Sequence, residues 1–367
     1  MNVIVIGAGV IGSSVADVLA RRGLDVTVLD MRAPGRGATQ ASAGVLAPFI
    51  EAHDDSPLLG LAVRSLGLWD DFVAGLRARA TRPIEYARTG TLEVALDEDE
   101  AAHLRRSRLA LDARGVATEW LETTALRSFE PAVTGEATAG LFTPSHGFVG
   151  VASLMDALVE SSRLAGATFV QPAEAVRIDA ARNGVAVQAD QRTYDADWVV
   201  VAAGSWSSRV RVRGASLPPV RPIRGQLLQT TWTAPLPRRS VWGSGCYTVP
   251  WSDGTLLVGA TVEDVGFDER STVEGVASLT AAVQRMLPAA AQASIDAIRV
   301  GLRPASSDGL PWIGPLAAAP RVVTAAGHFR NGVLLAPLTA DLVARIIVDQ
   351  TQDPALAVTS PNRASAA

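Results

Sequence analysis

The stretch "VIVIGAGVIGSSVADVLARRGLDVTVLD", residues 3–30, decides the fold of this chain. A short β-branched run leads into a helical pattern, and a second apolar run follows and ends at Asp30. Gly7 permits a tight turn, Gly9 lets the backbone approach a pyrophosphate, and Gly12 allows the helix to pack closely on the strand. The spacing predicts a strand-helix-strand unit that binds a dinucleotide, with Asp30 accepting hydrogen bonds from the ribose. The alternative is a tight glycine turn followed by an incidental acid.

The composition excludes several kinds of chemistry. With 33 basic and 37 acidic residues the formal net charge is −4, so we expect neither nucleic acid nor an anionic membrane as a partner. Every basic residue is arginine, which excludes lysine Schiff bases and P-loop lysines. A single cysteine, Cys246, and four scattered histidines predict no disulfide and no metal site. They favour a reducing compartment, which we take to be the cytoplasm.

The N-terminal apolar run lacks the basic flank and cleavage site of a targeting segment, and no run reaches the roughly 18 apolar residues of a membrane span. Helical patterns recur at residues 58–79, 98–114, 151–165 and 273–286, and strand signals dominate between 217 and 266. This order predicts an α/β fold in which a discontinuous Rossmann-type domain is interrupted by a smaller β-rich α+β domain. The predicted ranges are 1–85, 145–215 and 296–355 for cofactor binding, 86–144 and 216–295 for substrate binding, and 356–367 for a frayed tail.

NAD and FAD share the glycine motif, so the rest of the chain must distinguish them. An NAD enzyme would normally continue with regular strand-helix-strand units. Here the second strand runs into "GATQASAGVLAP", residues 37–48, whose small side chains would let backbone N–H groups lie against a flat ring. The buried strands "VVVAAG" (199–204) and "VVTAAG" (322–327) both end in the same small residues. FAD fits this pattern better than NAD.

Further motifs follow in a characteristic order: "RPIRGQLL" (221–228), "YTVPWSDGTLLVGATVEDVGFD" (247–268), "GLRPASSDGLPWIGP" (301–315) and "GHFRNGVLLAP" (327–337). With the N-terminal stretch, they resemble the FAD-dependent D-amino-acid oxidase superfamily, and most of all its glycine oxidases of the thiamine-biosynthetic type. The resemblance covers residues 1 to about 348. It implies an FAD-binding Rossmann-type domain and oxidation of a small amino acid.

The resemblance also implies which residues contact the flavin. A loop at residues 328–334 would wrap the pyrimidine edge of the ring, with Asn331 and Gly332 in a left-handed or cap geometry. From Val333 a helix would begin, with its positive end toward the ring. Besides the three motif glycines, the implied contacts are Val10, Ile11, Asp30, Met31, Ala38, Thr39, Ala43, Gly44, Val45, Val176 (through its backbone, at the adenine), His328, Phe329, Arg330, Asn331, Gly332, Val333 and Leu334.

We expect the FAD to be non-covalent. In sarcosine oxidases, the cysteine that attaches the flavin precedes the segment equivalent to "LRPASSD", and this chain has Gly301 there. Cys246 is then interpreted as a packed strand residue.

Three side chains are implied to meet the substrate. Arg303 would pair with the amino-acid carboxylate, Tyr247 would share that task, and Arg330 would lie near the amine. A guanidinium fork grips a carboxylate bidentately, and a phenol adds a second fixed donor. Two alternatives remain at this point: Arg303 could form a structural ion pair, and Tyr247 could be a buried strand residue bonded to backbone.

The sequence thus predicts a flavoprotein oxidase for glycine or another small amino acid, with molecular oxygen as second substrate and hydrogen peroxide as a product. Hydride transfer from a neutral amine needs no strong side-chain base, in agreement with the absence of lysine. Alternatives are a D-amino-acid dehydrogenase with another electron acceptor, an NAD-dependent dehydrogenase, and a non-catalytic subunit. The resemblance to tetrameric enzymes is compatible with a homo-oligomer.

Overall fold

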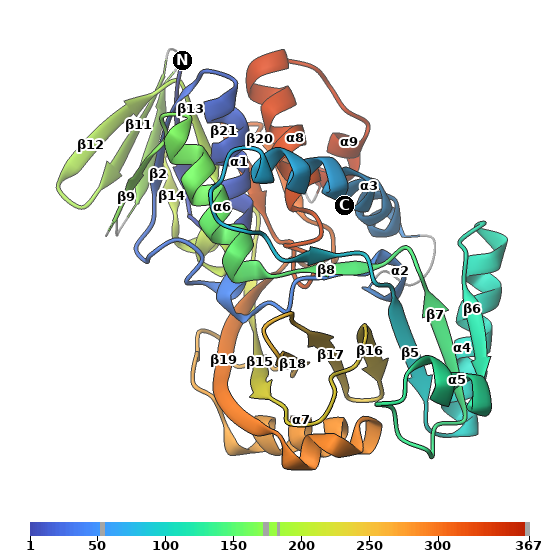
Figure 1. The fold of residues 1–367 in the computed structure, drawn as a ribbon. Helices are drawn as coiled ribbons and strands as arrows, with labels where there is room; N and C mark the ends of the chain where they lie inside the picture. The colour runs from blue at the N-terminus through green and yellow to red at the C-terminus, as the bar shows by residue number, and fades with distance from the viewer. Residues whose placement is uncertain (52–55, 172–175, 182–183, 364–367) are drawn as a thin grey trace.

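The computed structural model describes residues 1–51, 56–171, 176–181 and 184–363. Two halves lie one above the other in Figure 1: the upper half contains both termini, and the lower half is built on a long sheet with helix α7 (Val273–Met286) beneath it. The chain passes between the halves several times. The predicted α/β fold, with an interrupted Rossmann-type part, is confirmed.

A six-stranded sheet forms the centre of the upper half, in the order β20-β21-β13-β1-β2-β9. Strand β1 pairs in parallel with both β2 and β13, and only the edge strand β20 is antiparallel to its neighbour. Parallel strands covered on both faces are expected to be continuously apolar, as "VIVI" and "WVVV" are here. The strands are β1 (Asn2–Ile6), β2 (Asp25–Leu29), β9 (Thr168–Val170), β13 (Trp198–Val201), β20 (Trp312–Leu316) and β21 (Ala319–Ala326).

The two faces of this sheet pack against different layers. Val3 and Val5 point into a helical layer, and Ile4 and Ile6 point toward a smaller four-stranded sheet, because side chains alternate along a strand. The helices are α1 (Val10–Arg21), α3 (Pro57–Arg77), α6 (Val151–Leu164) and α8 (Ala336–Ala344), and the small sheet contains β10 (Arg177–Ala181), β11 (Gly184–Ala189), β12 (Arg192–Ala196) and β14 (Arg211–Val212).

The lower half contains an eight-stranded sheet in the order β19-β15-β18-β17-β16-β5-β7-β6. One face packs on α7 through residues such as Leu228, Val258 and Leu279, and the other face turns toward the upper half. The strands are β5 (Thr91–Ala95), β6 (Glu119–Glu122), β7 (Ala139–Thr143), β15 (Arg221–Thr231), β16 (Ser240–Gly243), β17 (Cys246–Pro250), β18 (Thr255–Gly259) and β19 (Ser294–Ala305).

Short elements join the halves. A three-stranded sheet, β3-β8-β4, runs between them, as the strand β8 shows in Figure 1. Within the described ranges, none of the helices is both long enough and apolar enough to span a membrane. The remaining elements are β3 (Val45–Leu46), β4 (Tyr86–Ala87), β8 (Gly147–Val149), α2 (Pro48–Glu51), α4 (Glu98–Ala113), α5 (Thr123–Phe129), α9 (Ala355–Thr359), the 3-10 turns Ala38–Ala41, Gly204–Arg209 and Pro288–Gln292, and the π turn Arg345–Asp349.

Two predicted boundaries differ from the structure. Strand β19 runs across the predicted boundary at residue 296, because it pairs with β15 along nearly its whole length. The prediction of a frayed tail is wrong for residues 356–363. Helix α9 is held by a hydrogen bond from Thr359 Oγ1 to the carbonyl of Ile313 (3.1 Å), and the Arg363 guanidinium lies 3.4 Å from the centre of the Trp312 ring. Residues 364–367 lie outside the described part.

Candidate active site

A cavity of about 390 Å³, within the usual size range of ligand pockets, is lined by residues of both halves. Nearly all of the predicted contact residues line it, although they come from seven separate segments of the chain. The exceptions are Gly12 and Leu334. The predicted residues on the cavity wall are Gly7, Gly9, Val10, Ile11, Asp30, Met31, Ala38, Thr39, Ala43, Gly44, Val45, Val176, Tyr247, Arg303, His328, Phe329, Arg330, Asn331, Gly332 and Val333.

The glycine turn opens the N-terminus of α1 to this cavity. Gly7 has φ +107°, a conformation that favours glycine, and Gly9 is the N-cap residue and offers no side-chain cap. The Val10 N–H is held by Thr39 Oγ1 at 3.0 Å. Gly12 lies behind the turn, where a Cβ atom would collide with the Gly7 carbonyl oxygen. Its role is therefore helix-strand packing, as its place in the motif predicts.

The carboxylate of Asp30 is fixed at the end of β2. One oxygen accepts the Ala8 N–H at 2.6 Å, and the other accepts the Arg32 N–H at 2.8 Å. A carboxylate has lone pairs beyond these two bonds, so a ribose hydroxyl can still donate to it. Asp30 thereby closes the glycine turn as well as lining the cavity.

The C-terminal loop differs from the prediction in three respects. The left-handed conformations are at Gly327 (φ +76°) and Phe329 (φ +48°), not at Asn331 and Gly332. Helix α8 begins at Ala336, three residues later than predicted, because residues 332–335 form turns that start with a bond from the Leu335 N–H to the Asn331 carbonyl. The third difference concerns Leu334, which is buried away from the cavity.

The surroundings of Leu334 and His328 show how this loop is anchored. The Leu334 carbonyl accepts hydrogen bonds from Ser65 Oγ (2.7 Å) and Trp69 Nε1 (3.0 Å) of α3. His328 Nε2 lies 3.0 Å from Thr339 Oγ1 of α8, and complete burial lowers the pKa of this histidine to about 3. A neutral, packed His328 holds the loop in place while Arg330 remains exposed at the cavity.

At the other end of the cavity, Arg303 lies over a glycine. It projects from β19 across Gly225 of β15, where a Cβ atom would collide with the guanidinium. Arg303 Nη1 donates to the carbonyl oxygens of Thr261 (2.9 Å) and Arg224 (3.3 Å). The side chain is thus held in one direction by backbone acceptors.

Tyr247 lines the same cavity and is placed there for a related reason. Its ring lies over Gly259 of the neighbouring strand β18, where a Cβ atom would stand 2.7 Å from the phenol oxygen. The Trp242 ring stacks on it with 4.6 Å between ring centres. Cys246, the preceding residue, points to the opposite face and into the core against α7, and burial raises the pKa of its thiol to about 12. A thiol on that face is directed away from the cavity.

Comparison with known proteins identifies the family. A family model described as "FAD dependent oxidoreductase" (DAO) matches residues 2–346, almost the whole chain. The chain belongs to this family. A glycine oxidase of Geobacillus kaustophilus is 34% identical over 94% of this chain and 92% of its own length. Two solved structures are also similar to this chain.

The crystal structure of a glycine oxidase from Geobacillus kaustophilus superimposes with a TM-score of 0.93 at 33% identity, and covers 98% of each chain. The iminodiacetate oxidase (IdaA) from Chelativorans sp. BNC1 gives a TM-score of 0.89 at 26% identity, again over 98% of each chain. Family membership makes this protein an FAD-dependent oxidoreductase, as the sequence predicts. The contact role of each individual residue stays a prediction.

The cavity fits the cofactor of this FAD-dependent family. The N-terminus of α1, where Gly9 supplies no side-chain cap, offers N–H donors for a pyrophosphate. Asp30 lies next to this turn at the end of β2, where it accepts the Ala8 N–H. The backbone passes closely at Gly44, where a Cβ atom would collide with the Val149 carbonyl. Asn331 Oδ1 is buried on the cavity wall with no hydrogen-bond partner among the described residues, which suits a polar ligand group.

Among the lining residues that the sequence did not predict, three have charged or aromatic side chains: Arg32, Trp206 and Arg209. The Arg32 guanidinium lies 4.6 Å from the Trp206 ring centre and pairs with Glu269 at 2.9 and 2.7 Å. The hydrogen bonds that Arg32 donates to Glu269 raise the pKa of this guanidinium. The signal for Trp206 was its motif "AAGSWS", and Arg32 follows Asp30 by two residues. In the described residues, no cluster of metal-ligating side chains accompanies them.

Proposed function

We propose that this FAD-dependent amino-acid oxidase acts on glycine or another small amino acid and produces the 2-oxo acid, ammonia and hydrogen peroxide. The observation that carries the proposal is that Arg303 and Tyr247 both line the cavity, each side chain lying over a glycine of the lower sheet. When bound, FAD would supply the redox chemistry, which is hydride transfer from the substrate Cα to flavin N5 and reoxidation by molecular oxygen.

The protein's part is to hold the amino acid in one orientation. The Arg303 guanidinium grips the carboxylate, and the Tyr247 phenol donates a further hydrogen bond to it. With the carboxylate held, the position of Cα is restricted, which raises the effective concentration of the reacting groups. Arg330, exposed beside the cavity, lies toward the amine and its positive charge favours the neutral form of that amine. Water then hydrolyses the released imino acid.

Aromatic packing restricts the movement of the Tyr247 ring. Trp242 stacks against Tyr247, and Trp251 packs in the same cluster as Tyr247 with only 9% of its surface exposed. Neither tryptophan is among the described residues that line the cavity, so the two rings act on the substrate only by packing against Tyr247. The similar iminodiacetate oxidase acts on a secondary amine, so N-substituted glycines belong among the test compounds.

The decisive experiment is a peroxide assay of the purified yellow protein with glycine, sarcosine, iminodiacetate and a panel of D- and L-amino acids. We expect turnover with glycine or another small member of the panel. Bleaching by substrate without air, followed by slow recovery in air, would instead indicate a dehydrogenase that uses another acceptor. Failure of every compound to bleach the protein would contradict the proposed substrate class.

A further inference from the structure

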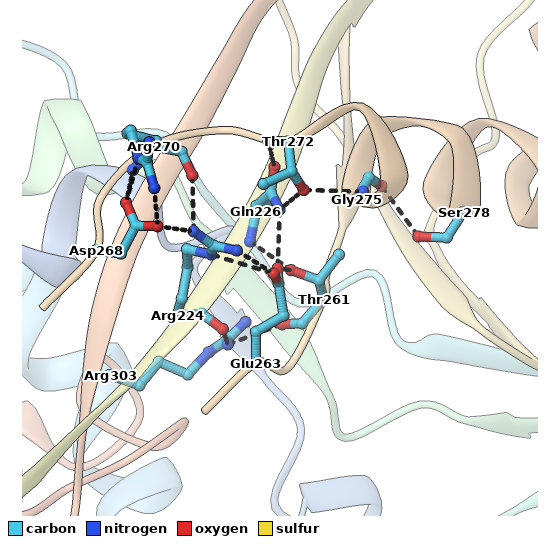
Figure 2. Close-up of polar contacts among 10 residues, drawn as sticks. All are labelled: Arg224, Gln226, Thr261, Glu263, Asp268, Arg270, Thr272, Gly275, Ser278 and Arg303. Atoms are coloured by element: carbon cyan, nitrogen blue, oxygen red, sulfur yellow. Dashed lines mark hydrogen bonds and ion pairs between the residues drawn. The ribbon is translucent and has the colours of Figure 1, made fainter. Parts of the chain in front are cut away.

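The segment that connects β18 to α7, residues 260–272, folds back along strand β15. Its backbone is tied to β15 by reciprocal bonds: the Arg224 N–H donates to the Glu263 carbonyl at 2.8 Å, and the Glu263 N–H donates to the Arg224 carbonyl at 2.9 Å. The Thr261 N–H donates to the Gln226 carbonyl at 3.2 Å. Figure 2 shows the side chains that complete this network.

The Arg224 side chain lies inside the network, with 5% of its surface exposed. Its guanidinium donates to Glu263 Oε2 at 2.5 Å, to Asp268 Oδ2 at 2.9 Å and to the Arg270 carbonyl at 3.1 Å. A buried cation requires such partners, because removal of one leaves an uncompensated charge. In Figure 2 the Arg224 side chain points toward Glu263 and Asp268 of the connecting segment, and Arg224 is not among the described residues that line the cavity.

Glu263 is the centre of the network. Its second oxygen, Oε1, accepts from Gln226 Nε2 at 2.8 Å and from Thr261 Oγ1 at 2.5 Å. Partial burial acts to raise the pKa of Glu263, but the hydrogen bonds from Arg224, Thr261 and Gln226 together lower it. The carboxylate thus stays ionised and connects Thr261 of the loop to Arg224 of the sheet.

These two connected residues are the ones whose carbonyl oxygens hold Arg303. Arg303 Nη1 donates to the Thr261 carbonyl at 2.9 Å and to the Arg224 carbonyl at 3.3 Å, so one guanidinium nitrogen sits between them (Figure 2). An arginine side chain has several rotatable bonds, and its fork is useful only when its direction is fixed. A shift of either carbonyl would turn the fork relative to the substrate.

We propose that Glu263, acting through Arg224 and Thr261, is a positioning residue for the Arg303 guanidinium and thereby tunes the affinity for the substrate carboxylate. This inference rests on the proposed function, in which Arg303 binds that carboxylate. Glu263 does not line the cavity, as far as the described residues define its wall, and it acts without touching the substrate.

The test uses Glu263→Gln in the FAD-containing protein, with Asp264→Asn as the matched control. Asp264 is the next residue and pairs with Arg221 in an exposed ion pair. Acetate binding is measured by titration of the flavin absorption spectrum, and glycine turnover by peroxide release. For Glu263→Gln we expect the acetate Kd and the glycine KM to rise about fivefold to fiftyfold, with kcat within about twofold and FAD content unchanged. The control should leave all four unchanged.

A double-mutant cycle with Arg303→Lys separates positioning from general structure. If Glu263 acts through Arg303, the effect of Glu263→Gln on the acetate Kd should largely disappear in the Arg303→Lys background. Additive effects, or a lower unfolding temperature with unchanged Kd and KM, would overturn the inference. If Glu263→Gln does not fold, Thr261→Val removes one of the bonds to the same carboxylate and should raise the acetate Kd in the same direction.

Failure of the proposed function would look different. In that case the Arg303→Lys protein would bind acetate with the same Kd as the wild-type protein, and no amino acid would give peroxide. If Arg303→Lys raises the acetate Kd but Glu263→Gln leaves it unchanged, the positioning role of Glu263 is contradicted and the proposed function is not.

Discussion

The two ends of the cavity are built in different ways. At the end formed by the glycine turn, residues 7–12 are consecutive, and the backbone itself faces the cavity. At the other end, Arg303 and Tyr247 come from β19 and β17, and each side chain lies over a glycine of an intervening strand. The first end depends on local conformation, and the second depends on the register of four strands. Substitutions should therefore affect the two ends differently.

The largest effect is expected at the glycine turn. Gly12→Val would place side-chain atoms where the Gly7 carbonyl lies, so both the turn and the packing of α1 must change. We expect a loss of about 3 kcal/mol or more in the free energy of unfolding and little FAD retained, measured by denaturant unfolding and flavin absorbance. Gly67→Val, on the exposed side of α3 where no atom lies within 4 Å of the new Cβ, is the control and should remain yellow and stable.

Substitution at the other end should spare the cofactor. Arg303→Ala removes a charge-assisted pair of about 1.5–3 kcal/mol, so the KM for the amino acid should rise about tenfold to 150-fold while FAD stays bound. Gly225→Ala should change KM in the same direction with the charge retained, because its Cβ displaces the guanidinium. Steady-state kinetics with a peroxide assay measures both, and an unchanged KM in Arg303→Ala would refute the carboxylate role.

The lower sheet contains a buried carboxyl group, Glu93, that should make the free energy of unfolding depend on pH. Glu93 of β5 lies opposite Trp242, and burial raises its pKa from 4.5 to about 7. The folded protein therefore holds a proton that the unfolded chain releases, so its contribution to stability is present below pH 4.5 and is lost as the pH rises through 7. Glu93→Gln should make the protein about 1–3 kcal/mol more stable than the wild type at pH 8, and no more stable at pH 4.

Denaturant unfolding at the two pH values measures this difference. Glu98→Gln, which changes an exposed side chain at the start of α4, serves as the control and should show no such pH-dependent gain. Equal stability of Glu93→Gln and wild type at pH 8 would show that Glu93 is solvated in the folded protein.

The smallest effect is expected at Gly332. The atom nearest to a Cβ added at Gly332 is the His328 Cβ, at 3.8 Å, so the polypeptide itself tolerates a larger residue. Because Gly332 lines the cavity, the new side chain would enter the space for the cofactor. Gly332→Val should weaken FAD binding by about 1 kcal/mol, roughly fivefold in Kd, and change the stability of the FAD-free protein by less than about 0.5 kcal/mol. Ultrafiltration of the holoenzyme gives the Kd for FAD. The prediction is contradicted if the free energy of unfolding of the FAD-free protein falls by more than the free energy of FAD binding does.

Local patterns carried much of the prediction. The helices expected at residues 98–114, 151–165 and 273–286 appear at Glu98–Ala113, Val151–Leu164 and Val273–Met286, because their apolar spacing and flanking residues lie within the helices themselves. The predicted start of the last helix, Val333, was wrong. The stretch "VLLAP" is apolar throughout, so periodicity could not indicate that the helix begins at Ala336. The prediction of a frayed tail was wrong because the Arg363 guanidinium stacks on Trp312, about fifty residues earlier in the chain.

The sequence by itself determined the glycine turn, the family and the choice of FAD, since each depends on residues that are close neighbours in the chain or on motifs in a known order. Only the tertiary structure decided that Thr261 and Arg224 hold Arg303, that Trp206 and Arg32 line the cavity, and that Cys246 faces away from it. The physical reason is strand register. Which side chains meet across a sheet depends on how distant strands pair, and a shift of one residue would exchange every side chain between the two faces.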